Sequence, residues 1–211
     1  MLVTVNLAAI FFLLEDENPE FLEITGLGNV KSAEEAQGIK LVEKRRIERL
    51  ELVWTRDDKR FMEDDEILKE LLPPDTVKRF ELRGYRSRNF PSWVMGIATS
   101  LPNLTTIRLW ALPNCTNLPP LGQLPELEPL TIEKMDSMRK IGGDLYGGIR
   151  AFPRLQYLSL EYMECLEDWN MLYSSSEDSL NEHMLPSLLN LYIEQCPRLR
   201  LKPCLPGAGG N

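Results

Sequence analysis

Histidine is almost absent from this chain of 211 residues, and its four cysteines lie far apart. The single histidine is His183, and no two cysteines have the Cys-x-x-Cys spacing. Zinc sites need clusters of these residue types, and a Ser–His–Asp triad needs a histidine beside its nucleophile. We therefore expect no metal site, no cofactor and no enzyme activity. We expect the cysteines to be reduced, structural thiols in a cytoplasmic protein.

An excess of positive charge is missing as well. The chain has 24 Lys and Arg against 32 Asp and Glu, which gives a formal net charge of -8. Because binding to nucleic acid needs a basic surface, this balance disfavours nucleic acid as the partner. The content of 43% hydrophobic and 27% charged residues is typical of a chain that folds.

No apolar run is long enough to span a bilayer, so no membrane span is expected. The longest run, Met1 to Leu14, has no preceding Lys or Arg and is followed by Glu15-Asp16-Glu17 where a signal peptide would have small residues. A signal peptide therefore fits poorly. Two alternatives stay open: a strand or helix that packs on the end of the fold, or sequence foreign to it.

One short pattern recurs along the chain: apolar, two variable, apolar, one variable, apolar. Complete copies begin at Ile47, Val77, Leu104, Leu127, Leu155 and Leu188, at spacings of 30, 27, 23, 28 and 33 residues, and a weaker first copy lies at 21–24. Apolar residues that alternate with variable ones predict β-strands, and these spacings scatter around the leucine-rich-repeat period. We expect an α/β leucine-rich-repeat solenoid, a curved stack of about seven repeats with short parallel strands on its concave face and helices and irregular turns on its convex face.

Between the strands, the sequence predicts two helices. One is expected over residues 32–46, where Ser32 and Glu35 form a capping box, and the other over 64–72, which begins with acidic residues. Later connections are rich in Pro and Gly and predict extended or irregular turns. Pro129 lies inside an expected strand and should weaken its pairing. We expect three segments: a divergent apolar segment 1–18, the repeat domain 19–202 and a flexible tail 203–211.

Several segments resemble plant nucleotide-binding leucine-rich-repeat disease-resistance proteins in their repeat region. The resemblance extends over about residues 20–202 and rests on residues 23–30, 32–36, 50–54, 83–85, 90–93, 118–125, 141–147 and 196–199. It implies the recognition region of an intracellular immune receptor, which senses pathogen effectors or modified host proteins and restrains a nucleotide-binding switch domain. No Gly-x-x-x-x-Gly-Lys-Ser/Thr motif occurs, so we expect the chain to lack that domain.

The variable strand positions are the candidate binding residues, since they should point away from the core. We predict that a protein partner contacts Arg79, Glu81, Arg83, Arg108, Trp110, Thr131, Glu133, Tyr157, Ser159, Glu161, Tyr192 and Glu194. Arg49, Glu51, Val53, Thr106 and Asn190 extend the same rows. Arg, Trp and Tyr dominate interface hot spots. The competing interpretation is that all of these are ordinary solvated strand residues.

Other notable residues have structural interpretations. Trp54, Trp93 and Trp169 are expected to pack at strand ends and turns. The acidic clusters at 57–58, 63–66 and 164–168 are explained by helix starts and solvated loops better than by metal or acid–base sites.

Leucine-rich repeats also occur in other settings, which leave three alternative functions. A substrate adaptor for ubiquitin ligation would need a ligase-recruiting domain, and none is visible. An extracellular receptor ectodomain would have more regular repeats with paired cysteine caps. A non-functional receptor fragment stays open and agrees with Pro129 and the divergent first residues.

Overall fold

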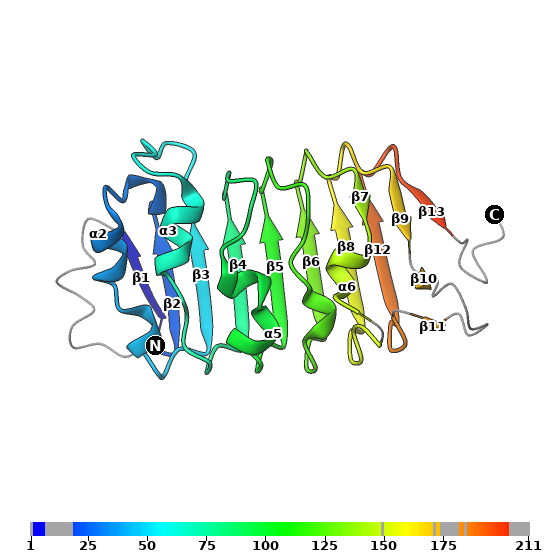
Figure 1. The fold of residues 1–211 in the computed structure, drawn as a ribbon, viewed down its shortest axis with the longest axis horizontal. Helices are drawn as coiled ribbons and strands as arrows, with labels where there is room; N and C mark the ends of the chain where they lie inside the picture. The colour runs from blue at the N-terminus through cyan, green and yellow to red at the C-terminus, as the bar shows by residue number, and fades with distance from the viewer. Residues whose placement is uncertain are drawn as a thin grey trace.

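Every copy of the repeated pattern forms a strand, and these strands lie side by side in one parallel sheet (Figure 1). The computed structural model describes residues 2–6, 19–148, 150–170, 172–173, 182–183 and 185–202. The sheet has eight strands in chain order: β1 (Leu2–Asn6), β2 (Phe21–Thr25), β3 (Arg49–Val53), β4 (Arg79–Arg83), β5 (Thr106–Trp110), β6 (Pro129–Glu133), β8 (Tyr157–Glu161) and β12 (Asn190–Glu194). The strands expected from the pattern are therefore confirmed.

The strands pair in one register, which stacks the apolar positions of successive strands into columns. Leu50 lies opposite Phe80, and Leu52 lies opposite Leu82. All four side chains are at most 3% exposed. A third column follows the strands and holds fully buried side chains at Leu112, Met135 and Met163. The core is thus a continuous row of columns rather than a central cluster.

The last strand departs from this pattern. Ile193 of β12 was expected to point into the core, but its side chain is 38% exposed. The reason is that β12 is the last strand of this sheet in the part of the chain that the structure describes. An apolar column loses its cover where stacking stops.

Backbone geometry repeats at the start and end of the strands. The carbonyl of Glu48, for example, accepts hydrogen bonds from the N–H groups of both Lys78 (2.8 Å) and Arg79 (2.9 Å). Directly after six strands, the chain turns through a left-handed residue with φ between 53° and 75°: Gly26, Gly84, Ala111, Lys134, Tyr162 and Gln195. Only two of these six are glycine, so the fold imposes the conformation on residues that rarely adopt it.

Pro129 weakens its strand as expected. The carbonyl of Thr105 accepts one hydrogen bond, from the Glu128 N–H at 3.0 Å, where other strand starts have two. The pairing of β5 with β6 accordingly begins one position late, at Ile107 and Leu130. The cause is the missing N–H of proline.

Helices cover one face of the sheet (Figure 1). The first expected helix is much shorter than predicted: α2 spans Ala33–Gln37, and a separate 3-10 turn η3 spans Leu41–Glu43. Its start agrees with the prediction, because the Ser32 hydroxyl accepts from the Glu35 N–H at 3.3 Å. It ends early because the chain turns at Gly38 and then passes through left-handed Lys40 (φ 50°). The second expected helix is confirmed as α3 (Asp64–Glu70).

The later connections contain more regular structure than the Pro/Gly content suggested. They hold the short helices α4 (Ser92–Met95), α5 (Ile97–Ser100) and α6 (Gly143–Tyr146) and the 3-10 turn η4 (Leu121–Gln123). Another 3-10 turn, η2 (Leu27–Asn29), lies in an earlier connection. A second parallel sheet joins β7 (Lys140–Ile141), β9 (Asp168–Asn170) and β13 (Arg200–Lys202), and β10 (Leu172–Tyr173) pairs with β11 (Glu182–His183). Stacking of equivalent turns creates this regularity, which no single connection shows in its own sequence.

The divergent first segment is placed in part. Residues 2–6 form β1, which pairs in parallel with β2 from Leu2–Phe21 to Asn6–Thr25. This agrees with a strand that packs on the end of the fold. Residues 7–18 and the expected flexible tail 203–211 lie outside the described residues.

We predict that Gly84→Ala lowers the free energy of unfolding by about 2–4 kcal/mol. Gly84 has φ of +75°, and a Cβ there would lie 2.1 Å from the backbone oxygen of Trp54. Urea unfolding measures the change. Gly142→Ala is the matched control, because no heavy atom lies within 4 Å of its Cβ position. Equal stability of the two variants would show that the strand-end turn is not constrained.

Replacing Pro129 by Thr should raise the free energy of unfolding by about 1 kcal/mol, since it restores one N–H donor to the Thr105 carbonyl. The control is Pro125→Thr, which lies before the strand. A loss of stability in Pro129→Thr alone would contradict the role assigned to the missing donor.

Candidate functional site

The candidate binding residues lie on the face of the main sheet opposite the helices, which we call the open face. Strand side chains alternate between the two faces, so the variable positions share this side. Strand register arranges them in three rows across β3 to β12. The first row holds Arg49, Arg79, Thr106, Tyr157 and Asn190. The middle row holds Glu51, Glu81, Arg108, Thr131, Ser159 and Tyr192, and the last row holds Val53, Arg83, Trp110, Glu133, Glu161 and Glu194.

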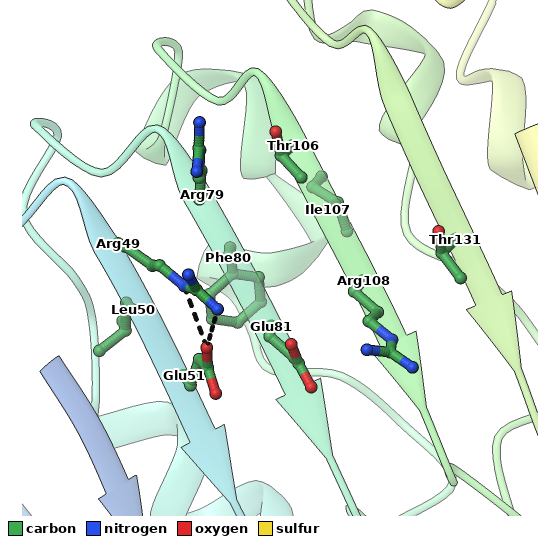
Figure 2. Close-up of a pocket in the computed structure, with 10 residues that line it drawn as sticks. All are labelled: Arg49, Leu50, Glu51, Arg79, Phe80, Glu81, Thr106, Ile107, Arg108 and Thr131. Atoms are coloured by element: carbon green, nitrogen blue, oxygen red, sulfur yellow. Dashed lines mark hydrogen bonds and ion pairs between the residues drawn. The ribbon is translucent and has the colours of Figure 1, made fainter. Parts of the chain in front are cut away.

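A shallow pocket occupies the start of this face (Figure 2). Its lining comes from four neighbouring strands: Arg49, Leu50, Glu51, Arg79, Phe80, Glu81, Thr106, Ile107, Arg108 and Thr131. Arginine and glutamate side chains alternate over it. The polar groups of four separate segments therefore meet in one surface, as the periodicity predicted.

Most charged groups on the open face are already paired with one another. Arg49 contacts Glu51 at 2.6 Å, Arg83 contacts Glu81 at 2.7 Å and Arg108 contacts Glu133 at 3.1 Å. Such pairs hold the side chains in fixed positions, although exposed pairs contribute little to stability.

Three of the variable positions are buried, which alternation alone does not predict. Glu51 is 6% exposed, Val53 is 5% exposed and Glu133 is 7% exposed. The guanidinium of Arg49 lies against the carboxylate of Glu51, and the Arg49 Nε–H donates to Glu51 Oε1 at 3.0 Å. Long neighbouring side chains thus cover shorter ones, and these three residues offer a partner little surface of their own.

Trp110 is held from two sides. The guanidinium of Arg83 lies 4.7 Å and the ammonium of Lys134 lies 5.1 Å from its ring centre. Its Nε1–H donates to Glu133 at 2.8 Å. Lys134 also lies 5.4 Å from the ring of Tyr162. The expected hot-spot tryptophan is therefore only partly exposed and is fixed before any partner arrives.

Lys134 and Tyr162 belong to this surface, and the strand pattern did not single them out. Each directly follows a strand and has positive φ, at 56° and 53°. Their left-handed backbone turns them back beside the last row. The signal in the sequence is their equivalent position after two copies of the pattern.

The exposed members of the predicted set are Arg79, Arg108, Tyr157, Tyr192 and Glu194. Tyr157 is 46% exposed and Tyr192 is 58% exposed. No ion pair to Arg79 is found in the described part of the chain. Arg79 and the two tyrosines, which lie on three different strands, are therefore open to a partner.

Carboxylates also gather at one end of the last row. Glu133 lies opposite Glu161, and Glu161 lies opposite Glu194. Like charges directly opposite each other on neighbouring strands are destabilising. This end of the open face is therefore acidic, whereas the first row begins with Arg49 and Arg79.

Comparison with known proteins agrees with this arrangement. A family model described as R13L1/DRL21 leucine-rich repeats matches residues 15–135. The chain belongs to this leucine-rich-repeat family. The short parallel strands with helices on one face are the α/β structure of such repeats, and the resemblance noted in the sequence is confirmed.

The relatives are described as plant disease resistance proteins. At3g14460 of Arabidopsis thaliana is 31% identical over 195 residues, which cover 86% of this chain and 13% of the relative. RPP13-like protein 1 of Arabidopsis thaliana is 26% identical, covering 84% of the chain and 18% of the relative. RGA2 of Solanum bulbocastanum is 26% identical, covering 85% and 19%. The chain thus spans less than a fifth of these relatives and corresponds to a resistance-protein repeat region. No solved structure matches it.

The acidic cluster at 63–66 is not simply solvated. Asp64 is 3% exposed and accepts hydrogen bonds from the guanidinium of Arg60 at 2.6 Å and the N–H of Arg86 at 2.6 Å. Arg60 also donates to the carbonyl of Gly84 at 3.0 Å. Burial raises the pKa of Asp64, and these donors oppose the rise. This network fixes the start of α3 to the end of β4.

The remaining expectations concern packing and thiols. Trp54, Trp93 and Trp169 are at most 7% exposed, so their packing role is confirmed. Burial raises the pKa of the Cys115 thiol to about 12, which disfavours the reactive thiolate. Within the described ranges, no His, Cys, Asp and Glu cluster could hold a metal ion. No helix among those residues is long and apolar enough to cross a membrane.

The pKa of Asp64 makes a testable difference. The pKa of Asp64 is raised in the folded protein, so the folded state binds the carboxyl proton more tightly than the unfolded chain. In the unfolded chain the pKa of Asp is about 3.9. Ionisation of Asp64 therefore opposes folding as pH rises above that value. Asp64→Asn is neutral at every pH, so the free energy of unfolding of wild type minus that of Asp64→Asn should fall as pH rises from the unfolded-state pKa through the folded-state pKa of Asp64. This difference is the gap to be measured.

Urea unfolding over a pH series measures the gap, with exposed Glu66→Gln on the same helix as the control. A gap that widens with pH would mean that attraction to Arg60 outweighs burial at Asp64.

Proposed function

We propose that this chain is a protein-binding leucine-rich-repeat region of an intracellular plant immune receptor. Its partner would be a pathogen effector, a modified host protein or the nucleotide-binding domain of the same receptor. The proposal places it in the cytoplasm and gives it a role in recognition rather than catalysis. The family and the disease-resistance relatives support this class of function.

The binding unit in this proposal is a repeat domain of residues 19–202. It is a curved solenoid of about seven repeats, one for each copy of the pattern. The single chain of neighbouring strands from β2 to β12 supports it. Each repeat is too small to bury its own apolar face, so the stack is the smallest folded unit.

The observation that carries the proposal is the exposure of large side chains on one face. Two tyrosines, Tyr157 and Tyr192, present 46% and 58% of their surface beside the ion-paired rows. Exposing large rings does little for folding, whereas Tyr and Arg contribute most to protein interfaces. Around them, Arg83, Trp110 and Glu133 are held in place, so a partner meets a surface that is largely ordered in advance.

Charge points to the kind of partner. Glu161 lies opposite Glu194 at a cost in stability, which a basic partner segment would offset. The partner region over the first row would carry acidic groups opposite Arg49 and Arg79. Complementary charge would fix the orientation of the partner along the strands.

The test compares two triple variants of the purified chain. Arg79, Tyr157 and Tyr192 are replaced together by Ala, and these side chains are exposed, so folding should be retained. The control replaces Glu66 and Lys69 on α3 and the exposed Arg88 before α4 by Ala, which leaves the open face intact. Proteins captured from plant leaf extract are quantified by mass spectrometry.

We expect the wild type and the control to capture equal amounts of at least one plant protein. The open-face variant should capture at least tenfold less of that protein. The loss of two contacts worth about 1 kcal/mol each is enough for this factor. Equal loss in both variants, or no loss in either, would contradict binding through the open face.

A further inference from the structure

An arginine that contacts both an aromatic ring and a carboxylate occurs twice on the open face. In the first case the guanidinium of Arg49 lies 4.3 Å from the ring centre of Phe21 and 2.6 Å from the carboxylate of Glu51. Phe21 begins β2 and is paired with Arg49 in the strand register. The face of an aromatic ring attracts a cation, and the N–H groups of a guanidinium pair with a carboxylate at the same time.

The second case joins β4 and β5. The guanidinium of Arg83 lies 4.7 Å from the ring centre of Trp110 and donates to Glu81 at 2.7 Å. Lys134 adds a second cation beside this ring and also lies 5.4 Å from the ring centre of Tyr162. Each of these exposed or half-buried rings thus has a cation that the chain itself supplies.

Tyr157 on β8 and Tyr192 on β12 are the exceptions. No Lys or Arg lies over either ring in the part of the chain that the structure describes, although these are the most exposed rings of the open face, at 46% and 58%. The sequence explains the difference, because no Lys or Arg occurs between Arg154 and Arg198. Two rings therefore face solvent where the chain has no cation to place beside them.

The carboxylates of the open face show the same division. Glu51, Glu81 and Glu133 each form an ion pair with an arginine of this face. Glu161 of β8 and Glu194 of β12 form no ion pair within the described residues. The last two strands of the main sheet thus present rings and carboxylates like those of the earlier strands, but without the arginine that joins them there.

Strand register brings these side chains together. On β8, Ser159 lies between Tyr157 and Glu161 on the same face, and its hydroxyl donates to Glu161 at 2.6 Å. On β12, Tyr192 lies opposite Ser159. Glu194 lies opposite Glu161. Neighbouring strands are roughly 5 Å apart and residues two apart on one strand roughly 7 Å, so one side chain placed above the short Ser159 reaches a ring and both carboxylates.

We propose that β8 and β12 bind an arginine side chain of the protein partner, in the manner of the chain's own arginines on the earlier strands. Tyr157 and Tyr192 supply the aromatic faces, and Glu161 and Glu194 supply the acceptors. A lysine ammonium is a compact charge without a planar face, so it fits this combination less well. This inference rests on the proposed function of the open face and names the chemistry of its partner.

Fluorine NMR of the full chain labelled with 3-fluorotyrosine follows the rings directly, and single tyrosine replacements assign the signals. The probe is a short Gly/Ser peptide that carries two arginines. We expect this peptide to shift the signals of Tyr157 and Tyr192 in a saturable manner, whereas those of the buried Tyr85 and Tyr146 stay unmoved. Absence of a shift at Tyr157 and Tyr192 would overturn the proposal.

Three further peptides test the guanidinium. In these the arginines are replaced by citrulline, which has a similar shape without the charge, by lysine or by trimethyllysine. We expect no binding of the citrulline peptide and weaker binding of the lysine and trimethyllysine peptides than of the arginine peptide. Binding of the citrulline peptide as tight as that of the arginine peptide would rule out recognition of a cation. Equal or tighter binding of either lysine form would rule out recognition of a guanidinium.

Neutral variants test the carboxylates. Glu161→Gln with Glu194→Gln should weaken binding of the arginine peptide about tenfold, because the charge-assisted hydrogen bonds are lost. Fluorescence anisotropy of the labelled peptide measures the affinity. The matched control is Glu66→Gln with Asp144→Asn, which changes the net charge equally at exposed positions of α3 and α6. An equal loss in both double variants would reduce the effect to net charge and refute the site.

Replacement of the rings tests the stacking. Tyr157→Leu with Tyr192→Leu should weaken the arginine peptide about tenfold, and Phe at both positions should restore most of the affinity, because the face of the ring is retained. Both side chains are exposed, so folding should be retained in either variant. A Phe variant that binds as weakly as the Leu variant would contradict contact with the rings.

Failure of this inference is distinguishable from failure of the proposed function. Capture of a plant protein through the open face, without binding of the arginine peptide, would refute the arginine site alone. Binding of the arginine peptide by a chain that captures no plant protein through the open face would support the site and count against the proposed function.

Discussion

The burial of one repeat's apolar residues against those of the next is the constraint on which this structure depends. Leu50 and Leu52 are fully buried between Leu22 and Ile24 of the preceding strand and Phe80 and Leu82 of the next. A single repeat has no interior of its own. Ile193 in the last described strand of the main sheet is exposed, because no further strand covers its apolar side chain there. The core therefore forms only when the strands pair in the register that places their apolar residues opposite one another.

That constraint also builds the open face. Once the apolar positions are fixed inward, the variable residues of six strands must form rows on the other side. Register places Arg108 beside Glu133, 25 residues away in sequence, whereas Arg49 and Glu51 are paired along one strand. Register also places Glu161 beside Glu194. It thus creates both an ion pair between strands and the acidic end that a partner would neutralise.

The turns that follow the strands form a second set of stacked positions. A left-handed residue follows six strands, and it turns side chains such as Lys134 and Tyr162 back beside the last row. At the carboxyl ends of β3, β4 and β5, Trp54, Arg83 and Trp110 line one pocket. Arg60 reaches the same place from the loop before α3 and is held there by Asp64. Stacked turns, like stacked strands, can form a surface that no single repeat contains.

Local periodicity and the missing N–H of one proline were enough to predict the strands, their apolar columns, the outward positions and the defect at Pro129. Local signals also predicted the start of α2, through Ser32 and Glu35, and the presence of α3. The burial of Glu51 and Glu133, the end of α2 at Gln37 and the pocket that Trp54 and Trp110 line with four arginines became evident from the three-dimensional arrangement. These features arise between repeats, where cover and pairing come from residues about 25 to 30 positions away, and such contacts leave no mark in the local pattern.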